Sequence, residues 1–281
     1  MIVGGSLYSL NDALTKLLTA NYSIVEIMFF IHLFSLLPLL FLITRFQDLK
    51  IFQIQQMGPL LLRSVFGCAA VGCFIYSFSI LPLADAYVIS FIAPLFMALL
   101  SAPFLNEKVG KHQWYAVIIG FSGVLIMMRP GADVFGITGF VALLGSFCYA
   151  VSLILTRKCS LTENNFMIFL SFTITSIISA GIFLPFNWKP PLASDLGLLL
   201  ASGLLTYCSQ MAFTQAFRLA PASVVGPFDY ASLIWACLLG YMIWGDLPDI
   251  YCISGAFLVV LSGLYLIFKE LKTASFKALL S

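Results

Sequence analysis

The sequence predicts an all-α membrane protein in which ten transmembrane helices form two inverted repeats of five, with both termini in the cytoplasm. Three observations lead to this prediction: the composition, a pattern that occurs twice along the chain, and the distribution of basic residues. Of the 281 residues, 61% are hydrophobic and 9% are charged, whereas a soluble domain has about 25% charged residues. A chain of this composition is expected to have a lipid bilayer as its solvent.

Apolar runs follow one another along the chain, and a run of about 20 residues is long enough to cross a bilayer. Turn residues or charges separate most of them, as at Arg129 to Gly131 and at Gly245 to Pro248. Leu81 and Pro82 form almost the whole connection between the third and fourth runs, so these two are expected to be tightly antiparallel. The expected helices span residues 2–19, 24–44, 58–79, 82–104, 112–128, 137–156, 165–185, 196–217, 220–244 and 249–268.

A stretch of the first half recurs in the second half. Residues 81–124 and 219–263 each contain a long apolar run, an acidic residue at its end, a short polar turn and a second apolar run. Leu83 lies over Leu219, 136 positions further on, and Glu107 lies over Asp246, 139 positions further on. The chain therefore contains a repeated membrane unit.

The first helix has its own copy in the second half. Gly4, Tyr8 and Lys16 correspond to Gly145, Tyr149 and Arg157, 141 positions further on. A repeat of five helices is an odd number, so the second copy enters the membrane from the opposite side, as in many secondary transporters. A purely structural duplication is the alternative interpretation. The expected domains are a first repeat over residues 1–131, a second over 132–270, and a cytoplasmic tail over 271–281.

The basic residues predict the orientation, because short cytoplasmic loops are enriched in lysine and arginine. With the N-terminus inside, the outside loops hold Arg129 and Lys189, while Lys16 and Arg63 lie within helices. This distribution places both termini in the cytoplasm and supports an even number of helices. The ten residues on the inside are Arg45, Lys50, Lys108, Lys111, Arg157, Lys158, Arg218, Lys269, Lys272 and Lys277.

Missing motifs disfavour several classes of protein. His32 and His112 are far apart and no HExxH or GxSxG motif occurs, which disfavours an intramembrane enzyme. The nucleotide-binding motif GxxxxGK[ST] does not occur either, so transport driven by ATP hydrolysis is not expected. The seven cysteines lie scattered in apolar segments, as expected of small buried side chains rather than metal ligands. Neither a cofactor nor a nucleic-acid partner is expected. No cleavable signal peptide is expected either, since Asn11, Asp12 and Lys16 interrupt the first apolar run.

Charged side chains in the middle of a membrane cost at least about 2.5 to 3.5 kcal/mol, so each one is a candidate for function. Asn11 and Asp12 lie near the middle of the first helix, and Lys16 follows one turn later on the face of Asp12. Two interpretations are open. Asp12 and Lys16 neutralise each other as a structural pair, or they bind the polar part of a zwitterionic solute or exchange a proton.

Further candidates lie on the second, third and fourth helices. His32 is halfway along the second helix, where it serves either proton coupling or packing. Arg63 is either an anchor whose stem reaches the interface or a ligand for a solute carboxylate. Tyr87 follows Asp85 in the first turn of the fourth helix, where the helix dipole favours an acid.

The second repeat adds five candidates. Asp229 and Tyr230 fall near the middle of the ninth helix, with Trp235 further along, and a carboxylate beside aromatic rings suits an organic cation. Packing is the alternative for these three. Tyr149 and Gln210 are long enough to reach a central cavity.

The whole chain resembles the drug/metabolite transporter superfamily, in the branch with two EamA domains, and is especially similar to bacterial S-adenosylmethionine uptake transporter-like members. His32 stands where relatives tend to have an arginine, and Asp246 where a glutamate is usual. The residues that carry the resemblance are Leu62 to Gly67, Leu81 to Ala86, Pro94, Asn106 to Lys108, Ala220 to Ser223, Pro227 to Tyr230, Trp235 and Trp244 to Asp246.

The resemblance and the inverted halves imply a secondary transporter of the bacterial inner membrane that works by alternating access. Its central site is expected between helices 1, 2, 3, 4, 6, 8 and 9 of the ten. Uptake of S-adenosylmethionine, or of a similar cationic or zwitterionic solute, is what the resemblance implies. Export of amino acids or other metabolites is the alternative, and an intramembrane enzyme or a channel is the alternative of another class. The expected partners are the solute, the lipid bilayer and, as coupling species, a proton or a counter-solute.

Overall fold

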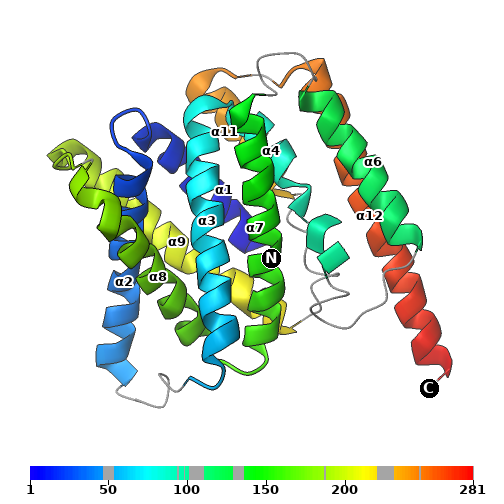
Figure 1. The fold of residues 1–281 in the computed structure, drawn as a ribbon, viewed down its shortest axis with the longest axis horizontal. Helices are drawn as coiled ribbons and strands as arrows, with labels where there is room; N and C mark the ends of the chain where they lie inside the picture. The colour runs from blue at the N-terminus through cyan, green and yellow to red at the C-terminus, as the bar shows by residue number, and fades with distance from the viewer. Residues whose placement is uncertain are drawn as a thin grey trace.

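A computed structural model gives the structure of the protein and describes residues 1–46, 54–93, 95–97, 99–100, 111–128, 136–186, 188–219, 231–246 and 248–280. Within these ranges the chain is helical and contains no strand (Figure 1). The helices are α1 Ile2–Leu18, α2 Ile24–Phe46, α3 Met57–Ile80, α4 Leu83–Ser90, α6 Lys111–Met128, α7 Ile137–Ser160, α8 Asn165–Phe183, η3 Leu184–Phe186, α9 Ala193–Leu219, α11 Ala231–Trp244 and α12 Ile250–Leu280.

Five helical segments in the described ranges are long and apolar enough to cross a membrane: Ile24–Phe41, Met57–Ile80, Ile137–Ser160, Asn165–Phe186 and Ala193–Leu219. Shorter apolar helices include Ile234–Trp244 and Ile250–Tyr265. The all-α membrane class is therefore confirmed. Ten spans with both termini in the cytoplasm stay a prediction.

Three helix boundaries differ from the expected ones. The fourth helix was expected over residues 82–104, but α4 already ends at Ser90. The sequence has Pro94 four positions further on, and a proline has no N–H to donate to the carbonyl of Ser90. The sixth helix continues to Ser160, so Arg157 lies in its last turn rather than in a loop. The last helix continues to Leu280, through the segment that was expected to be a tail.

Side chains close several helix ends. Ser23 and Glu26 form a capping box at the start of α2, in which Glu26 Oε2 accepts from Ser23 N at 2.9 Å and Glu26 N donates to Ser23 Oγ at 3.3 Å. Glu163, in the loop after α7, caps α3 of the other half: its Oε1 accepts from Gln55 N and Gln56 N at 2.8 and 2.6 Å. This contact ties the loop of the second half to the start of a helix in the first half.

A tyrosine in the turn after α1 holds the start of α9. The Tyr22 hydroxyl donates to Asp195 Oδ2 at 2.8 Å and accepts from Leu192 N at 2.9 Å. Burial raises the pKa of Tyr22 above its ordinary value, so the phenol keeps its proton for Asp195.

Each of the main helix pairs has a counterpart formed by the equivalent helices of the two halves. α3 packs on α7 as α9 packs on α1, and α2 packs on α9 as α8 packs on α3. The fifth helices of the two halves, α6 and α12, lie side by side at the right edge of Figure 1, away from α2 and α8 at the left. This is the contact pattern expected of two repeats related by a two-fold axis.

The α1–α9 and α7–α3 crossings use equivalent residues. A Cβ added to Gly4 of α1 would lie 2.7 Å from the ring of Phe213 in α9. A Cβ added to the equivalent Gly145 of α7 would lie 2.8 Å from Cys73 Cβ and 3.4 Å from Phe74 in α3. Phe74 and Phe213 are 139 positions apart. Both crossings therefore have a glycine at the point of close approach.

Candidate functional site

A cavity lies between the halves, with walls from α1, α2, α3, α4, α7, α8, α9 and α11. In this arrangement of the helices the cavity volume is about 120 Å³. The polar lining residues are Tyr8, Asn11, Asp12, Thr15, His32, Arg63, Tyr87, Ser90, Tyr149, Ser152, Thr156, Thr206, Gln210 and Ser232, and the aromatic ones include Phe74, Phe78, Phe91, Phe172 and Phe213.

Arg63 is the buried cation of this cavity. Its side chain is 3% exposed, and Nε donates to Thr156 Oγ1 at 3.1 Å, Nη1 to the Ile168 carbonyl at 3.3 Å and Nη2 to Gln210 Oε1 at 3.1 Å. The guanidinium carbon lies 4.6 Å from the ring centroid of Phe172. Among the described residues no carboxylate pairs with it. The interfacial anchor considered from the sequence is wrong, because the side chain points into the protein.

Asp12 is the carboxylate of the cavity. Its Oδ2 accepts from the Tyr87 hydroxyl at 2.5 Å, and Tyr87 OH lies 3.2 Å from Ser9 Oγ. The neighbouring Asn11 is 7% exposed and its Oδ1 is buried without a hydrogen-bond partner. Tyr87 therefore joins α4 to α1 beside an acid and an amide that face the same cavity.

His32 has one satisfied and one unsatisfied ring nitrogen. It is 2% exposed, and Nδ1 lies 2.8 Å from the Met28 carbonyl. Because a carbonyl only accepts, Nδ1 carries the proton, and in the neutral ring Nε2 is an acceptor. Within the described part of the chain Nε2 is buried without a hydrogen-bond partner, and the ring stands edge-on to Phe172 with 5.1 Å between centroids.

Two tyrosines in equivalent positions stand over equivalent phenylalanines. Tyr8 contacts Phe213 edge-on at 5.2 Å, and Tyr149 contacts Phe74 edge-on at 6.0 Å. Gln210 Nε2 donates to the Tyr8 hydroxyl at 2.8 Å, while its Oε1 accepts from Arg63. Gln210 thus links the guanidinium of α3 to α1.

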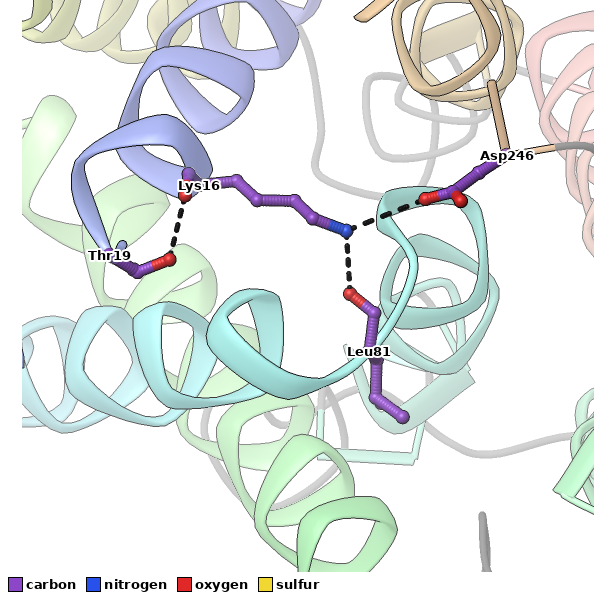
Figure 2. A network of polar contacts seen from close by, with 4 residues as sticks. All are labelled: Lys16, Thr19, Leu81 and Asp246. Atoms are coloured by element: carbon purple, nitrogen blue, oxygen red, sulfur yellow. Dashed lines mark hydrogen bonds and ion pairs between the residues drawn. The ribbon is translucent and has the colours of Figure 1, made fainter. Parts of the chain in front are cut away.

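Lys16 lies outside the cavity lining and does not pair with Asp12. Figure 2 shows its ammonium between the Leu81 carbonyl and the Asp246 carboxylate, with Nζ distances of 2.8 and 3.8 Å. It also lies 4.8 Å from the ring of Trp244. The Asp12–Lys16 couple considered from the sequence is wrong: Lys16 instead joins the end of α3 to the end of α11, and Asp246 is more than a solvated turn residue.

The structure brings most of the predicted substrate residues to one place. Asn11, Asp12, His32, Arg63, Tyr87, Tyr149 and Gln210 line the cavity. Of the other candidates, Trp235 is 38% exposed on α11 and, like Lys16, is not in the lining. Asp229 and Tyr230 lie outside the described residues. A role in substrate binding stays a prediction for all of them.

Sequence reasoning missed α8 and several lining residues. The expected site left out the seventh helix, yet Phe172 of α8 contacts both Arg63 and His32. Thr156 and Phe213 were also missed, although the repeat contains a signal for them: Thr156 is the equivalent of Thr15, and Phe213 of Phe74. An apolar ring in an apolar helix has no such signal of its own.

A family model for EamA-like transporters matches the chain over residues 1–129 and again over 136–269. The chain belongs to the EamA-like transporter family. It is a multi-pass membrane protein, its named relatives are bacterial, and its location is the inner membrane. The two matched ranges correspond to the two halves of the chain whose equivalent helices make equivalent contacts.

Relatives of this EamA-like protein are named as transporters of different solutes. It is 27% identical to an S-adenosylmethionine uptake transporter of Rickettsia bellii, over 96% of this chain and 92% of that protein. It is 27% identical to a pseudopaline exporter of Pseudomonas aeruginosa, over 91% and 90%. It is 30% identical to a riboflavin transporter of Vibrio cholerae, over 74% and 70%. A solved crystal structure shares the fold, with a TM-score of 0.67, 15% identity and coverage of 94% and 92%.

Proposed function

We propose that this EamA-like protein is a secondary transporter that moves a small organic solute with both positive and negative charge across the membrane by alternating access. S-adenosylmethionine or a similar solute is the proposed substrate. The observation that carries the proposal is the pair of charges in one cavity, Arg63 on α3 and Asp12 on α1. A guanidinium and a carboxylate held in a low-dielectric cavity favour a ligand that carries the complementary charges.

The packing of the two halves supports alternating access. Equivalent helices make equivalent contacts, as at Gly4 and Gly145. Two halves of nearly equal packing energy can exchange their arrangements about a central site, which is how inverted-repeat carriers expose the site to each side in turn.

The solute follows from the relatives and from the charges. A relative that covers 96% of the chain is named as an S-adenosylmethionine uptake transporter, and that molecule carries a carboxylate, an amine and a sulfonium. Arg63 suits the carboxylate, and Asp12 with the nearby aromatic rings suits the sulfonium. A proton or a counter-solute is the proposed coupling partner, with His32 as the titratable group in the cavity.

Export is the second candidate for the direction of transport. The relative named as a pseudopaline exporter is as similar to the chain as the uptake transporter is, at 27% identity. The same cavity serves either direction, because a carrier follows the gradient that drives it. The names of these relatives are names of transporters, which favours a carrier over an enzyme.

Solute counterflow in proteoliposomes tests the proposal. Vesicles that contain the protein and are loaded with unlabelled S-adenosylmethionine are expected to accumulate labelled S-adenosylmethionine transiently above equilibrium, and protein-free vesicles are not. A channel would let label equilibrate without overshoot, and an enzyme would change the labelled molecule. Absence of counterflow for S-adenosylmethionine would remove it as the substrate.

A further inference from the structure

We propose that Arg63, His32 and Phe172 form a pocket for an α-amino acid group. In this pocket Arg63 binds the carboxylate and His32 Nε2 accepts a hydrogen bond from the α-amino group. The inference deepens the proposed function and rests on it in one respect, that the cavity is where the solute binds. It narrows the solute to molecules that carry a free α-carboxylate and a free α-amine.

Arg63 has donors left for a carboxylate. A guanidinium carries five N–H groups, and the three hydrogen bonds to Thr156, Ile168 and Gln210 use one on each nitrogen. One N–H therefore remains on each terminal nitrogen. Each of these N–H groups can donate a charge-assisted hydrogen bond to a carboxylate oxygen. The three existing bonds also hold the guanidinium in one orientation, so little side-chain freedom is lost on binding.

The charge of Arg63 points to an anion as well. The side chain is 3% exposed, and no carboxylate of the described chain compensates it. A buried cation in a membrane protein is stabilised by an anionic partner. A solute carboxylate at Arg63 would be such a partner.

His32 limits which anion fits. With its proton on Nδ1 toward the Met28 carbonyl, the neutral ring presents a lone pair at Nε2. A phosphate has mainly acceptor oxygens and would meet this lone pair unfavourably. A carboxylate on a carbon that also bears an amine fits both residues, because the amine donates to Nε2 while the carboxylate pairs with Arg63.

Both groups contact Phe172. Arg63 Cζ lies 4.6 Å and the His32 ring centroid 5.1 Å from the centre of the same phenyl ring. Gly67 allows the ring to approach α3, since a Cβ there would lie 2.9 Å from Phe172. The ring of α8 is thus the shared neighbour of the cation of α3 and the acceptor of α2.

Altering the ligand tests the pocket without altering the protein. Binding of methionine, lysine and S-adenosylmethionine to the detergent-solubilised protein is measured by isothermal titration calorimetry, together with the carboxyl-amide and the desamino form of each amino acid, in which hydrogen replaces the α-amine, and with decarboxylated S-adenosylmethionine. For every free amino acid that binds, loss of the carboxylate is expected to weaken binding roughly 100-fold, and loss of the amine about 10-fold or more.

Two variants assign these losses to residues. Arg63→Gln should weaken the free acids strongly while binding the amides no worse than the wild type does. His32→Phe keeps an aromatic ring against Phe172 but removes the acceptor, so it should weaken binding of the free amino acids and leave binding of the desamino forms unchanged. Thr173→Val is the matched control on α8: it removes a buried hydroxyl that has no partner and is not in the cavity lining, and it should bind like the wild type.

The outcomes separate this inference from the proposed substrate. If an amino acid binds with this pattern but S-adenosylmethionine does not, the pocket stands and the proposed solute falls. If amides and decarboxylated forms bind as tightly as the free acids, or if none of the free amino acids binds, the pocket is overturned. A purely structural Arg63 would weaken all forms equally in the Arg63→Gln variant, which also overturns the inference.

Discussion

The two halves of the cavity wall have the same framework but different chemistry. On α1, Tyr8, Asn11, Asp12 and Thr15 line the cavity, and the residues 141 positions further on do so from α7. Tyrosine and threonine recur there as Tyr149 and Thr156. In contrast, Asn11 and Asp12 correspond to Ser152 and Leu153. The charge of the cavity is therefore asymmetric even though its walls are related by a pseudo-two-fold axis.

The helices next to them repeat this contrast. Phe74 of α3 recurs as Phe213 of α9, but Val71 corresponds to Gln210, and all four line the cavity. Both halves must make the same helix crossing, so the packing residues are under the same physical requirement in each. A solute has no two-fold symmetry, so its polar partners need not match. This contrast distinguishes the repeated residues, which hold the helices together, from the unrepeated polar residues, which would contact the solute.

Neutralising the acid of α1 should have the largest effect. Asp12→Asn keeps the shape of the side chain but removes the charge, and we expect the initial rate of S-adenosylmethionine uptake in proteoliposomes to fall roughly 100-fold. Leu153→Asn, the same amide at the equivalent position of α7, should change the rate less than about fivefold. Equal losses in the two variants would contradict an asymmetric site, and wild-type uptake in Asp12→Asn would place the site elsewhere.

Substituting the glycines at the helix crossings should have a smaller effect, which is a loss of stability. Gly145→Ala places a methyl group 2.8 Å from Cys73 Cβ, and overpacking of this kind costs about 1 to 3 kcal/mol. Gly4→Ala meets the Phe213 ring, which can turn aside, so it should cost less. Thermal unfolding in detergent measures both. Gly197→Ala is the control, because nothing lies within 4 Å of its added Cβ.

The basic residues at the ends of α1 and α7 should have the smallest effects. Lys16 donates to the Leu81 carbonyl at the end of α3, and Arg157 donates to the Phe217 carbonyl near the end of α9, at 2.8 and 2.5 Å. Replacing either by methionine removes a cation from the end of a helix, where it is worth about 0.3 to 1 kcal/mol. We expect similar small decreases in the unfolding temperature for Lys16→Met and Arg157→Met.

A variant of Asp246 distinguishes the two contacts of Lys16, one with the Leu81 carbonyl and one with the Asp246 carboxylate. Asp246 is 39% exposed at its side chain, so its attraction for Lys16 is screened and worth less than about 1 kcal/mol. Asp246→Asn should therefore lower the unfolding temperature less than Lys16→Met does. A larger decrease for Asp246→Asn would mean that the ion pair, not the Leu81 carbonyl, holds the lysine.

Much of the fold was predictable because a bilayer constrains the chain so strongly. Apolar runs of membrane length predicted the helices, and most of their ends agree with the structure within a few residues. The exceptions have local causes or lie in the tail: α4 ends at Ser90 where Pro94 follows, and α12 continues to Leu280. The candidate site was predictable in part, because charged residues in apolar helices are conspicuous. The pairing of charged side chains was not predictable, as Lys16 shows. The helical spacing suggested Asp12 as its partner, whereas the structure pairs it with Asp246.

Hydropathy and spacing along the chain were enough to predict the membrane class, the positions of most helices and the duplication. Only the packing of the helices shows which side chains share a cavity, that Arg63 is buried against Phe172, and that Asp12 bonds to Tyr87. Those outcomes depend on how each helix is rotated and where it crosses its neighbours. Rotation and crossing are set by close contacts between residues far apart in the sequence, such as Gly145 with Cys73, which no local pattern reveals.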